Sequence, residues 1–431
     1  MVTHAENETL VRVGPGTEMG EYMRRYWHPV ATSAQLPGPD CKPLRTKLLG
    51  QKFVVFRDSE GKVGMLDELC MHRGASLALG RVEEGGITCL YHGWKFAVDG
   101  TILDTPNNAD CRYRQRMKAP AYDVVEQSGL IWAYIGPKEQ KPPFRRFAAD
   151  LVPPENRYVL RIDVKANYLQ LWEGGLDSSH VSVLHTNQAR TSWAAGRGLE
   201  IDPDVNKWSP MDDPSPVFQV EDTPFGYHYS ATRNLPPSRH NEAMRNVRIT
   251  PAIFPTGRII AGPVADFLVW ETPMDDCSTS TYITVYSPKS PVDKNWVLKT
   301  LGLNDTRFWS ENDPEYKGTW ENDFYQDRDS MQTNWTGFNG IEQEDVAIGL
   351  SYGPIFDRTK ENLVAADLAV VRVRRRLLQV AAMVKAGEPA IGSQIADLTG
   401  VAAPDVDVPE GTDWRTIAPY HHEFAVSEAA E

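Results

Sequence analysis

Residues 70–74 are CMHRG and residues 89–94 are CLYHGW, and these two stretches decide the fold of the first part of the chain. Each stretch supplies one thiolate and one imidazole: Cys70 with His72, and Cys89 with His92. This set suits a [2Fe–2S] cluster that has two cysteines on one iron and two histidines on the other. A structural zinc site also accepts these residue types, but it usually pairs cysteine with cysteine. The mixed pairing therefore predicts the [2Fe–2S] cluster.

Residues 172–185, WEGGLDSSHVSVLH, hold a second group of metal-binding residue types. His180 and His185 are candidate ligands of a mononuclear Fe(II) in a site of two histidines and one carboxylate. The sequence favours a helix over 164–185, but residues five apart on an ideal helix diverge by about 140°. We therefore expect a bend or a helix end between the two histidines. Asp177 precedes His180 by one turn, where its carboxylate can accept the imidazole N–H and fix the tautomer.

The third ligand of this iron is expected to be a carboxylate from far along the chain. Three acids occur in GIEQEDVAIGL at 340–350, namely Glu342, Glu344 and Asp345. Asp345 directly precedes the apolar stretch that would dock on the histidine segment. We therefore expect Asp345 to be the ligand, with Glu344 as the alternative. Three protein ligands leave coordination positions open for O₂.

The overall composition excludes several classes of partner. The chain has 431 residues and a formal net charge of −13, which would repel a phosphate backbone, so we expect no nucleic-acid partner. No apolar run approaches the roughly 18–20 residues of a membrane span, so no membrane association is expected. The first residues lack the basic and apolar regions of an export signal. Five cysteines in so long a chain do not suggest disulfides, and a cytoplasmic location is expected.

The pattern of strands and turns predicts an α+β chain with two domains. We expect an N-terminal arm at 1–24, an all-β cluster domain at 25–145, and a catalytic domain with an antiparallel sheet at 146–431. Residues 52–66 are a predicted hairpin whose turn lies at 59–61. The Pro-rich stretch KEQKPPFRR supports a boundary between the two domains.

Two further segments have open interpretations. Apolar residues at helical spacing predict a helix over 370–384, and the arginines on it, Arg372 and Arg374 to Arg376, are expected to form a solvated face. The stretch 187–222 is rich in Pro, Asp and Gly and is too long for a passive connection. It is interpreted either as a lid or pocket wall, or as a solvated insertion.

Several stretches together resemble the oxygenase components of Rieske non-haem iron aromatic-ring oxygenases. They are CMHRG, CLYHGW, the E-x3-D-x2-H-x4-H run that ends at His185, QEDVAIGLSYGPIFDRTKENL at 343–363 and GPGTEMGEYMRRYWHPV at 14–30. The chain looks most similar to the phthalate dioxygenase-like branch, which includes aryl-ether O-demethylases. The resemblance implies a Rieske β-domain followed by a helix-grip (START-like) catalytic domain. It also implies homotrimers or multiples of them, in which Asp177 bridges His180 to a cluster histidine of the neighbouring subunit.

The function implied by this resemblance is that of a terminal oxygenase acting on an aromatic substrate. O₂ would be activated with electrons from a separate NAD(P)H-dependent reductase, directly or through a ferredoxin, because no GxGxxG follows a predicted strand. Ring dihydroxylation and aryl-ether O-demethylation both remain open. Arg233 and Arg248 are candidate partners of a substrate carboxylate, and solvent-facing strand arginines are the alternative. The alternative function is a Rieske-type electron-transfer protein without oxygenase activity, which would leave the second motif unexplained.

Overall fold

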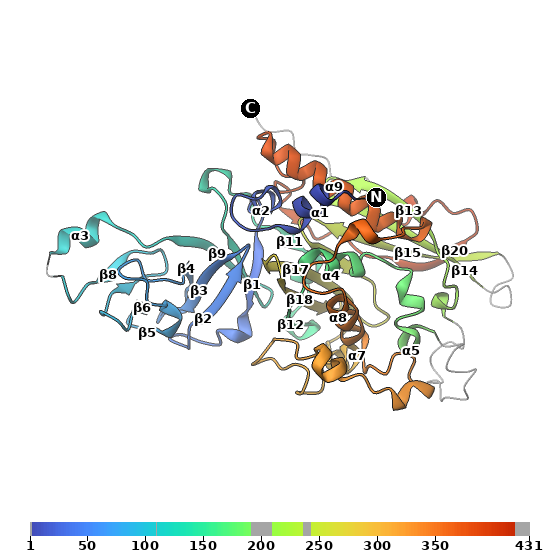
Figure 1. Cartoon of the computed structure of the whole chain (residues 1–431), viewed down its shortest axis with the longest axis horizontal. Helices are drawn as coiled ribbons and strands as arrows, with labels where there is room; N and C mark the ends of the chain where they lie inside the picture. The colour runs from blue at the N-terminus through green and yellow to red at the C-terminus, as the bar shows by residue number, and fades with distance from the viewer. Residues whose placement is uncertain (1, 109, 191–208, 236–242, 419–431) are drawn as a thin grey trace.

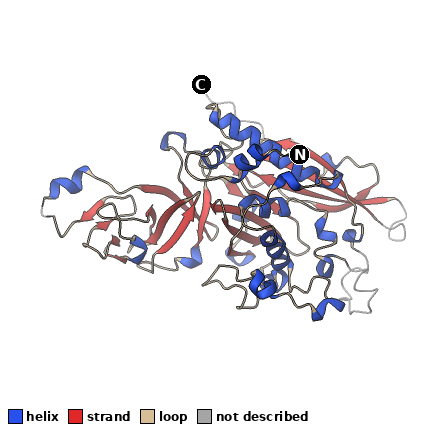
Figure 2. Ribbon diagram, in the orientation of Figure 1, coloured by secondary structure: helices blue, strands red, loops and turns tan. Residues whose placement is uncertain are grey.

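The computed structural model describes residues 2–108, 110–190, 209–235 and 243–418. The chain forms two regions that lie side by side along its long axis (Figure 1). The smaller region is built almost entirely of strands, and the larger one combines a broad antiparallel sheet with most of the helices (Figure 2). The α+β architecture expected from the sequence is confirmed.

Two antiparallel sheets make up the smaller region. The six-stranded sheet has the order β1-β10-β9-β4-β3-β2, and the four-stranded sheet runs β5-β6-β7-β8. The strands of the first are β1 (His28–Thr32), β2 (Leu44–Leu48), β3 (Gln51–Arg57), β4 (Val63–Asp67), β9 (Ala121–Gln127) and β10 (Leu130–Tyr134). Those of the second are β5 (Arg81–Glu83), β6 (Gly86–Thr88), β7 (Lys95–Phe96) and β8 (Ile102–Asp104), and the short helix α3 (Cys111–Arg116) follows. The pairing of β3 with β4 confirms the predicted hairpin.

One large antiparallel sheet forms the centre of the other region. Its order is β12-β18-β17-β16-β15-β14-β13, and β20 pairs with β15. The strands are β12 (Arg157–Val164), β13 (Val217–Thr223), β14 (Gly226–Asn234), β15 (Met244–Ile253), β16 (Gly257–Ile260), β17 (Asp266–Asp275), β18 (Ser278–Tyr286) and β20 (Asp405–Pro409). A separate pair, β11 (Arg146–Phe147) with β19 (Asp397–Leu398), is parallel. This curved sheet supports the helices that hold the functional residues.

The helices of the larger region pack on this sheet in two groups. They are α4 (Tyr168–Gly175), α5 (Thr186–Ala189), α7 (Lys294–Leu301), α8 (Ile341–Ser351) and α9 (Leu368–Lys385). Apolar residues of α7 and α8, such as Val297 and Val346, share a buried cluster with β12 and β18. The apolar face of α9 lies against β13 and α4, and residues Val373, Leu377 and Val380 are fully buried. The predicted C-terminal helix is therefore confirmed.

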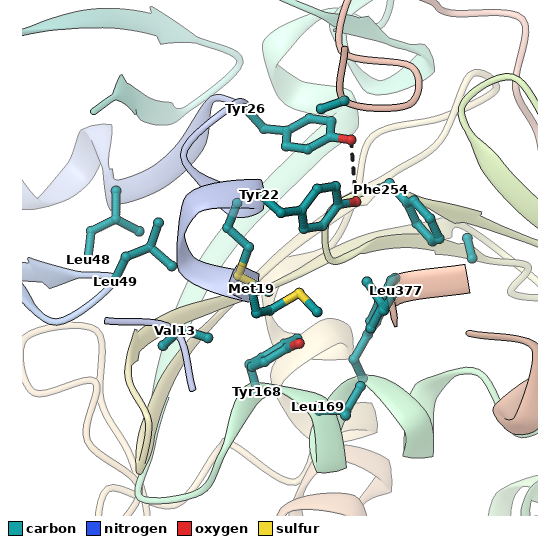
Figure 3. Packing of buried hydrophobic residues seen from close by; sticks show 14 of the residues in the cluster. Val13, Met19, Tyr22, Tyr26, Leu48, Leu49, Tyr168, Leu169, Phe254 and Leu377 are labelled. Carbon is teal, nitrogen blue, oxygen red and sulfur yellow. Dashed lines mark hydrogen bonds between the residues drawn. The ribbon is translucent and has the colours of Figure 1, made fainter. Parts of the chain in front are cut away.

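The first residues of the chain belong to the core of the larger region. Helices α1 (His4–Val11) and α2 (Glu18–Met23) contact α9, and α1 also contacts α4. The Tyr168 hydroxyl donates a hydrogen bond to the Leu10 carbonyl at 2.8 Å. Figure 3 shows Val13, Met19 and Tyr22 from this segment among apolar side chains of α4 and α9. The expected N-terminal arm thus packs as an integral layer of the core of the larger region, and the expected domain limits at 25 and 145 stay a prediction.

Candidate metal centres

The two loops that carry the expected cluster ligands have the same backbone design. Cys70 and His72 follow β4, whereas Cys89 and His92 lie between β6 and β7. The Gly74 N–H donates to the Cys70 carbonyl at 2.8 Å, and the Gly93 N–H donates to the Cys89 carbonyl at 2.9 Å. Both glycines have positive φ, +73° and +76°, a conformation that L side chains rarely adopt. Each loop therefore presents one sulfur and one imidazole from a matching turn.

The sulfur side of this centre is closed off from water. Cys70 is 3% exposed and Cys89 is 2% exposed. Burial raises the pKa of the Cys70 thiol to about 11, although the backbone N–H of His72, which is directed at the sulfur, lowers it. Iron would displace the thiol protons and leave thiolate ligands. Backbone N–H groups directed at a cluster sulfur tune its reduction potential.

The imidazole side of the centre has an aromatic neighbour and a nitrogen that needs a partner. The His72 ring stacks on Trp94 with centroids 4.5 Å apart and planes within 3°, and the His72 and His92 rings are also 4.5 Å apart. In the part of the chain that the structure describes, Nδ1 of His92 is buried without a hydrogen-bond partner. Such a nitrogen is available as a metal ligand. The donor set therefore fits a [2Fe–2S] cluster.

The second centre begins where helix α4 ends. This helix stops at Gly175, so both histidines lie beyond it: His180 opens a 3₁₀ turn and His185 is the N-cap residue of α5. The helix expected over 164–185 is therefore confirmed only over 168–175 and is wrong at both ends, whereas the expected break between His180 and His185 is confirmed, because the 3₁₀ turn ends at Ser182. The Asp177 carboxylate accepts the Ser179 N–H at 2.7 Å, which stabilises the turn that follows the helix.

Three ligand atoms converge at one point beyond this turn. The Nε2 atoms of His180 and His185 are 3.2 Å apart. Oδ1 of Asp345, from helix α8, lies 3.5 Å and 3.3 Å from these two nitrogens. Two ligands held about 2.1 Å from one metal at a right angle are about 3 Å apart. The arrangement therefore fits a single metal ion held by two histidines and one carboxylate.

A second carboxylate stands behind each imidazole, on the Nδ1 side. Oδ2 of Asp177 is 3.4 Å from Nδ1 of His180, and Oε2 of Glu344 is 2.7 Å from Nδ1 of His185. Burial raises the pKa of Asp177, but the hydrogen bonds from His180 and Ser179 lower it by more. The pKa therefore lies below its usual value, and the carboxylate stays charged. Glu344 lies on the ring edge remote from Nε2 and is not placed to bind the same metal.

The electrostatic environment of His185 favours positive charge. Burial lowers its pKa, but Asp345 and Glu344 together raise the pKa to about 10. In the absence of a metal, a proton therefore balances these carboxylates. A divalent cation would displace that proton and take over the same electrostatic role.

The remaining acid of the second motif has a structural partner set. Glu173 accepts three hydrogen bonds from Arg358, the shortest at 2.9 Å, and one from Arg374 at 2.6 Å. Both arginine side chains are at most 3% exposed. The expected solvated face of α9 is therefore wrong at Arg374, which points into the core to meet Glu173. This ion cluster ties α4 to α9 just before the iron centre.

The two candidate substrate arginines differ in their surroundings. Arg248 pairs with Asp405 at 3.1 Å and donates to the Ala261 carbonyl at 3.0 Å. Arg233 is fully buried, so the solvent-facing alternative is wrong for it. Its Nη2 donates to the Ser178 carbonyl at 2.6 Å, whereas Nε and Nη1 have no hydrogen-bond partner among the described residues. Burial, together with the nearby charge of Arg248, lowers the pKa of Arg233 to about 10.

Sequence reasoning missed Thr336, whose hydroxyl donates to Oε1 of Glu344 at 2.5 Å. No local signal marks this residue, because the contact joins a loop to helix α8. Residues 191–208 of the expected lid or insertion lie outside the described residues. Across the described ranges, none of the helices combines the length and the apolar character needed to cross a membrane.

Comparison with known proteins agrees with the two centres. Residues 26–122 match the family described as Rieske [2Fe-2S] domain, and residues 133–431 match the family described as LigXa C-terminal domain like. The oxygenase subunit of phthalate 4,5-dioxygenase from Pseudomonas putida is 35% identical, with 94% of each chain covered. The oxygenase subunit of 5,5'-dehydrodivanillate O-demethylase from Sphingobium sp. is 28% identical, with 90% of this chain and 82% of that protein covered.

A solved structure supports the same fold. The Pseudomonas putida CBB5 protein NdmA, in a mutant form with theobromine, superposes with a TM-score of 0.58 at 18% identity, covering 92% of this chain and 99% of the other. Its similarity concerns the fold alone. Taken together with the full-length relatives, the two domains and the two metal centres, these findings show that the chain belongs to the Rieske non-haem iron oxygenases, as a terminal oxygenase subunit with a [2Fe–2S] cluster and a mononuclear iron.

Proposed function

We propose that this oxygenase hydroxylates a carboxylated aromatic substrate at an iron held by His180, His185 and Asp345. When bound, the iron supplies the activation of O₂, for which three protein ligands leave positions open. The observation that carries the substrate class is the buried guanidinium of Arg233. Two of its nitrogen atoms, Nε and Nη1, have no hydrogen-bond partner among the described residues. A buried cation without an anion is costly, which supports a place for a negatively charged group beside Arg233.

The position of Arg233 connects that place with the metal centre. Its Nη2 is anchored on Ser178, the residue between Asp177 and Ser179. A carboxylate accepting hydrogen bonds from Nε and Nη1 would therefore lie close to the iron-binding turn, and its charge would offset that of Arg233. The similar Pseudomonas putida protein is named for phthalate, an aromatic dicarboxylate. Arg248, already paired with Asp405, is proposed as a weaker contributor to the same anion site.

Arg233→Met tests this assignment, with Arg248→Met as the comparison variant. Loss of charge-assisted hydrogen bonds costs about 1.5–3 kcal/mol, which is about a 10- to 150-fold weaker binding. We expect that loss in Kd for a benzoate-type substrate and little change for its neutral amide analogue. Arg248→Met should have a smaller effect. Equal losses for the acid and the amide in Arg233→Met would show that the arginine has only a structural role.

Two reaction outcomes share this geometry and are separated by their products. Ring dihydroxylation yields a cis-dihydrodiol, whereas hydroxylation of an ether methyl yields formaldehyde and a phenol. A panel of carboxylated aromatics with and without a methoxy group, supplied with a surrogate reductase, decides between them. An absence of turnover with every carboxylated member, alongside turnover of neutral aromatics, would refute the proposed substrate class.

We further propose that electrons pass from the cluster of one subunit to the iron of the next. Cys70, His72, Cys89 and His92 are the proposed cluster ligands.

The cluster loops and the iron centre of one chain lie far apart. Figure 1 shows β5 to β8, which flank the cluster loops, at the opposite end of the long axis from α5, and His185 lies at the start of α5. Leu79, Leu90 and Tyr91 are exposed at the cluster loops, which suits contact with a second copy. A homotrimer would bring this end against a neighbour's Asp177, the proposed catalytic bridge, and a separate reductase would deliver the electrons.

Hybrid trimers test the route. Chains carrying Cys70→Ser lack a cluster, and chains carrying His180→Ala lack the mononuclear iron. Mixed trimers should recover part of the activity, because some interfaces then join an intact cluster to an intact iron. No recovery in trimers of verified mixed composition would show that the electron path stays within one chain.

A further inference from the structure

The most buried polar contact of the iron centre lies behind His185. The side chain of Glu344 is 0% exposed, and that of His185 is 5% exposed. One oxygen of the carboxylate, Oε2, accepts the hydrogen bond from Nδ1 of His185 at 2.7 Å, and the other, Oε1, accepts from the hydroxyl of Thr336 at 2.5 Å. Both oxygens are therefore engaged, one by the imidazole and one by the loop that precedes helix α8.

The loop that carries Thr336 is itself firmly held. The side-chain oxygen of Asn334 accepts the Gly337 N–H at 3.0 Å, and its amide donates to the Phe338 carbonyl at 2.8 Å. Gly337 has φ +75°, and a Cβ on it would lie 2.5 Å from the Asp327 carbonyl, so the turn accepts only glycine. The hydroxyl of Thr336 is thus presented to Glu344 from a fixed backbone.

The same loop also contacts the segment on the other side of His185. Oδ1 of Asn187 accepts the Trp335 N–H at 2.9 Å, and its amide donates to Oδ1 of Asn334. His185 is therefore held from two directions by residues 334–336: through Glu344 at its ring and through Asn187 along its backbone. This is a denser support than the single 3.4 Å contact between Asp177 and His180.

We propose that Glu344 and Thr336 form a positioning pair that keeps the proton of His185 on Nδ1 and its Nε2 free to bind iron. Neither residue touches the iron; both act through the imidazole. The proposal rests on the proposed function, because it takes His185 as a ligand. A hydrogen bond to the remote nitrogen of a metal-binding histidine fixes both tautomer and ring orientation, and its loss typically weakens metal affinity about 10- to 100-fold.

This pairing also gives the two carboxylates behind the histidines different tasks. Glu344 is sealed from solvent and holds its imidazole closely, which suits retention of the metal. The Asp177 side chain is 21% exposed and contacts its imidazole at a longer distance, which leaves it accessible to a neighbouring subunit. Iron affinity should therefore depend on Glu344, and electron delivery on Asp177.

The test measures Fe(II) binding to the full chain with its cluster intact and its mononuclear iron removed. Competition with a chelator should give a Kd that is about 10- to 100-fold weaker for Glu344→Ala. Glu344→Gln, which keeps an acceptor oxygen for Nδ1, should recover most of the affinity. The Fe(II)–nitric oxide EPR signal should broaden in Glu344→Ala, because the imidazole is no longer held in one orientation. The cluster spectrum should be unchanged in all variants, which shows that the chain is folded.

Thr336→Val decides whether the threonine acts through the glutamate. In the wild-type background it should weaken Fe(II) binding severalfold, whereas in the Glu344→Ala background it should add nothing. Thr333→Val, which removes a hydroxyl that donates to the Ser330 carbonyl of the same loop, is the matched control and should leave Kd unchanged. Additive effects of Thr336→Val and Glu344→Ala would overturn the pairing.

A final arm separates this proposal from the assignment on which it rests. His185→Ala should abolish Fe(II) binding. If His185→Ala binds iron like the wild type, the proposed iron site is wrong. If His185→Ala loses iron while Glu344→Ala and Glu344→Gln both bind it with wild-type Kd and EPR signal, the iron site stands and the positioning role is refuted.

Discussion

Replacing Arg374 by glutamine should destabilise the protein far more than the same change at Arg372, two residues earlier on helix α9. The Arg374 side chain is 3% exposed; its Nε donates to Glu173 at 2.6 Å, and its Nη2 donates to Glu361 at 2.8 Å. The Arg372 side chain is 39% exposed and pairs with Asp222, which is 34% exposed. The two substitutions remove the same chemical group from the same helix. A difference in their effect on stability therefore measures the consequence of burying the ion pair.

The magnitude follows from what each substitution leaves behind. Without Arg374, the Glu361 carboxylate loses its only ionic partner among the described residues, and Glu173 keeps Arg358 alone. Breaking a buried pair by removing one partner costs about 3–5 kcal/mol. An exposed pair contributes about 0.2–1 kcal/mol, so Arg372→Gln should be nearly neutral. At about 2–4 °C per kcal/mol for a large domain, the Tm of Arg374→Gln should fall by at least about 6 °C.

Differential scanning calorimetry of both variants, with cluster and iron loaded, provides the measurement. The visible spectrum of the cluster reports whether each variant entered the scan with its centres intact. Similar small losses in Tm for the two variants would show that Glu361 and Glu173 find other partners or water. The inference that the ion cluster holds α4 against α9 would then be refuted.

Three further outcomes test other parts of the structure. Burial raises the pKa of Glu173, but Arg358 and Arg374 lower it more, so that it lies below 4.5. The contribution of the ionised Glu173 to protein stability is therefore complete above pH 4.5 and is lost as the pH falls through the lowered pKa. The Tm difference between wild type and Glu173→Gln should accordingly be constant from pH 8 to about pH 5 and shrink in more acidic buffer, and a difference that grew on acidification would contradict this sign. Cys70→Ser should abolish the [2Fe–2S] absorption and lower the iron content from about three to about one per chain by metal analysis; a retained spectrum would exclude Cys70 as a ligand. Gly93→Ala should lower cluster occupancy more than Gly74→Ala, because both glycines have positive φ but only a Cβ on Gly93 meets Pro106, at 2.9 Å; equal occupancies would rule out this clash.

The metal centres were largely predictable because their information is local. The cluster ligands Cys70 and His72 are two positions apart in the sequence, and Asp177 and His180 are three positions apart. Residue type and spacing then limit the chemistry before the fold is known. The choice between Glu344 and Asp345 depends on the fold, because neighbours on a helix point about 100° apart and the docking angle of α8 decides which one faces the histidines.

Burial of individual charges could not be predicted in this way. Arg374 lies in a run of arginines that is typical of a solvated face, and its partner Glu173 is 201 residues away in the sequence. Arg233 likewise occupies an unremarkable strand position, and yet it is fully buried, with its Nη2 hydrogen-bonded to the carbonyl of Ser178, 55 residues earlier. Such contacts arise only when the large sheet and the helices come together, and no local pattern reports them.

The placement of α1 sets an order in which the molecule can be completed. Asn7 accepts a hydrogen bond from Arg358 at 3.3 Å, across a separation of 351 residues. A ribosome adding about 5–20 residues per second needs roughly 18–70 s to synthesise that interval. The strands of the cluster region, which end at Tyr134, are synthesised early in this interval, whereas α8 is synthesised near its end and α9 after it. During synthesis, a site for the iron–sulfur cluster therefore exists before a site for the mononuclear iron does, and a catalytic region expressed without the residues that precede the cluster domain would lack one layer of its own core.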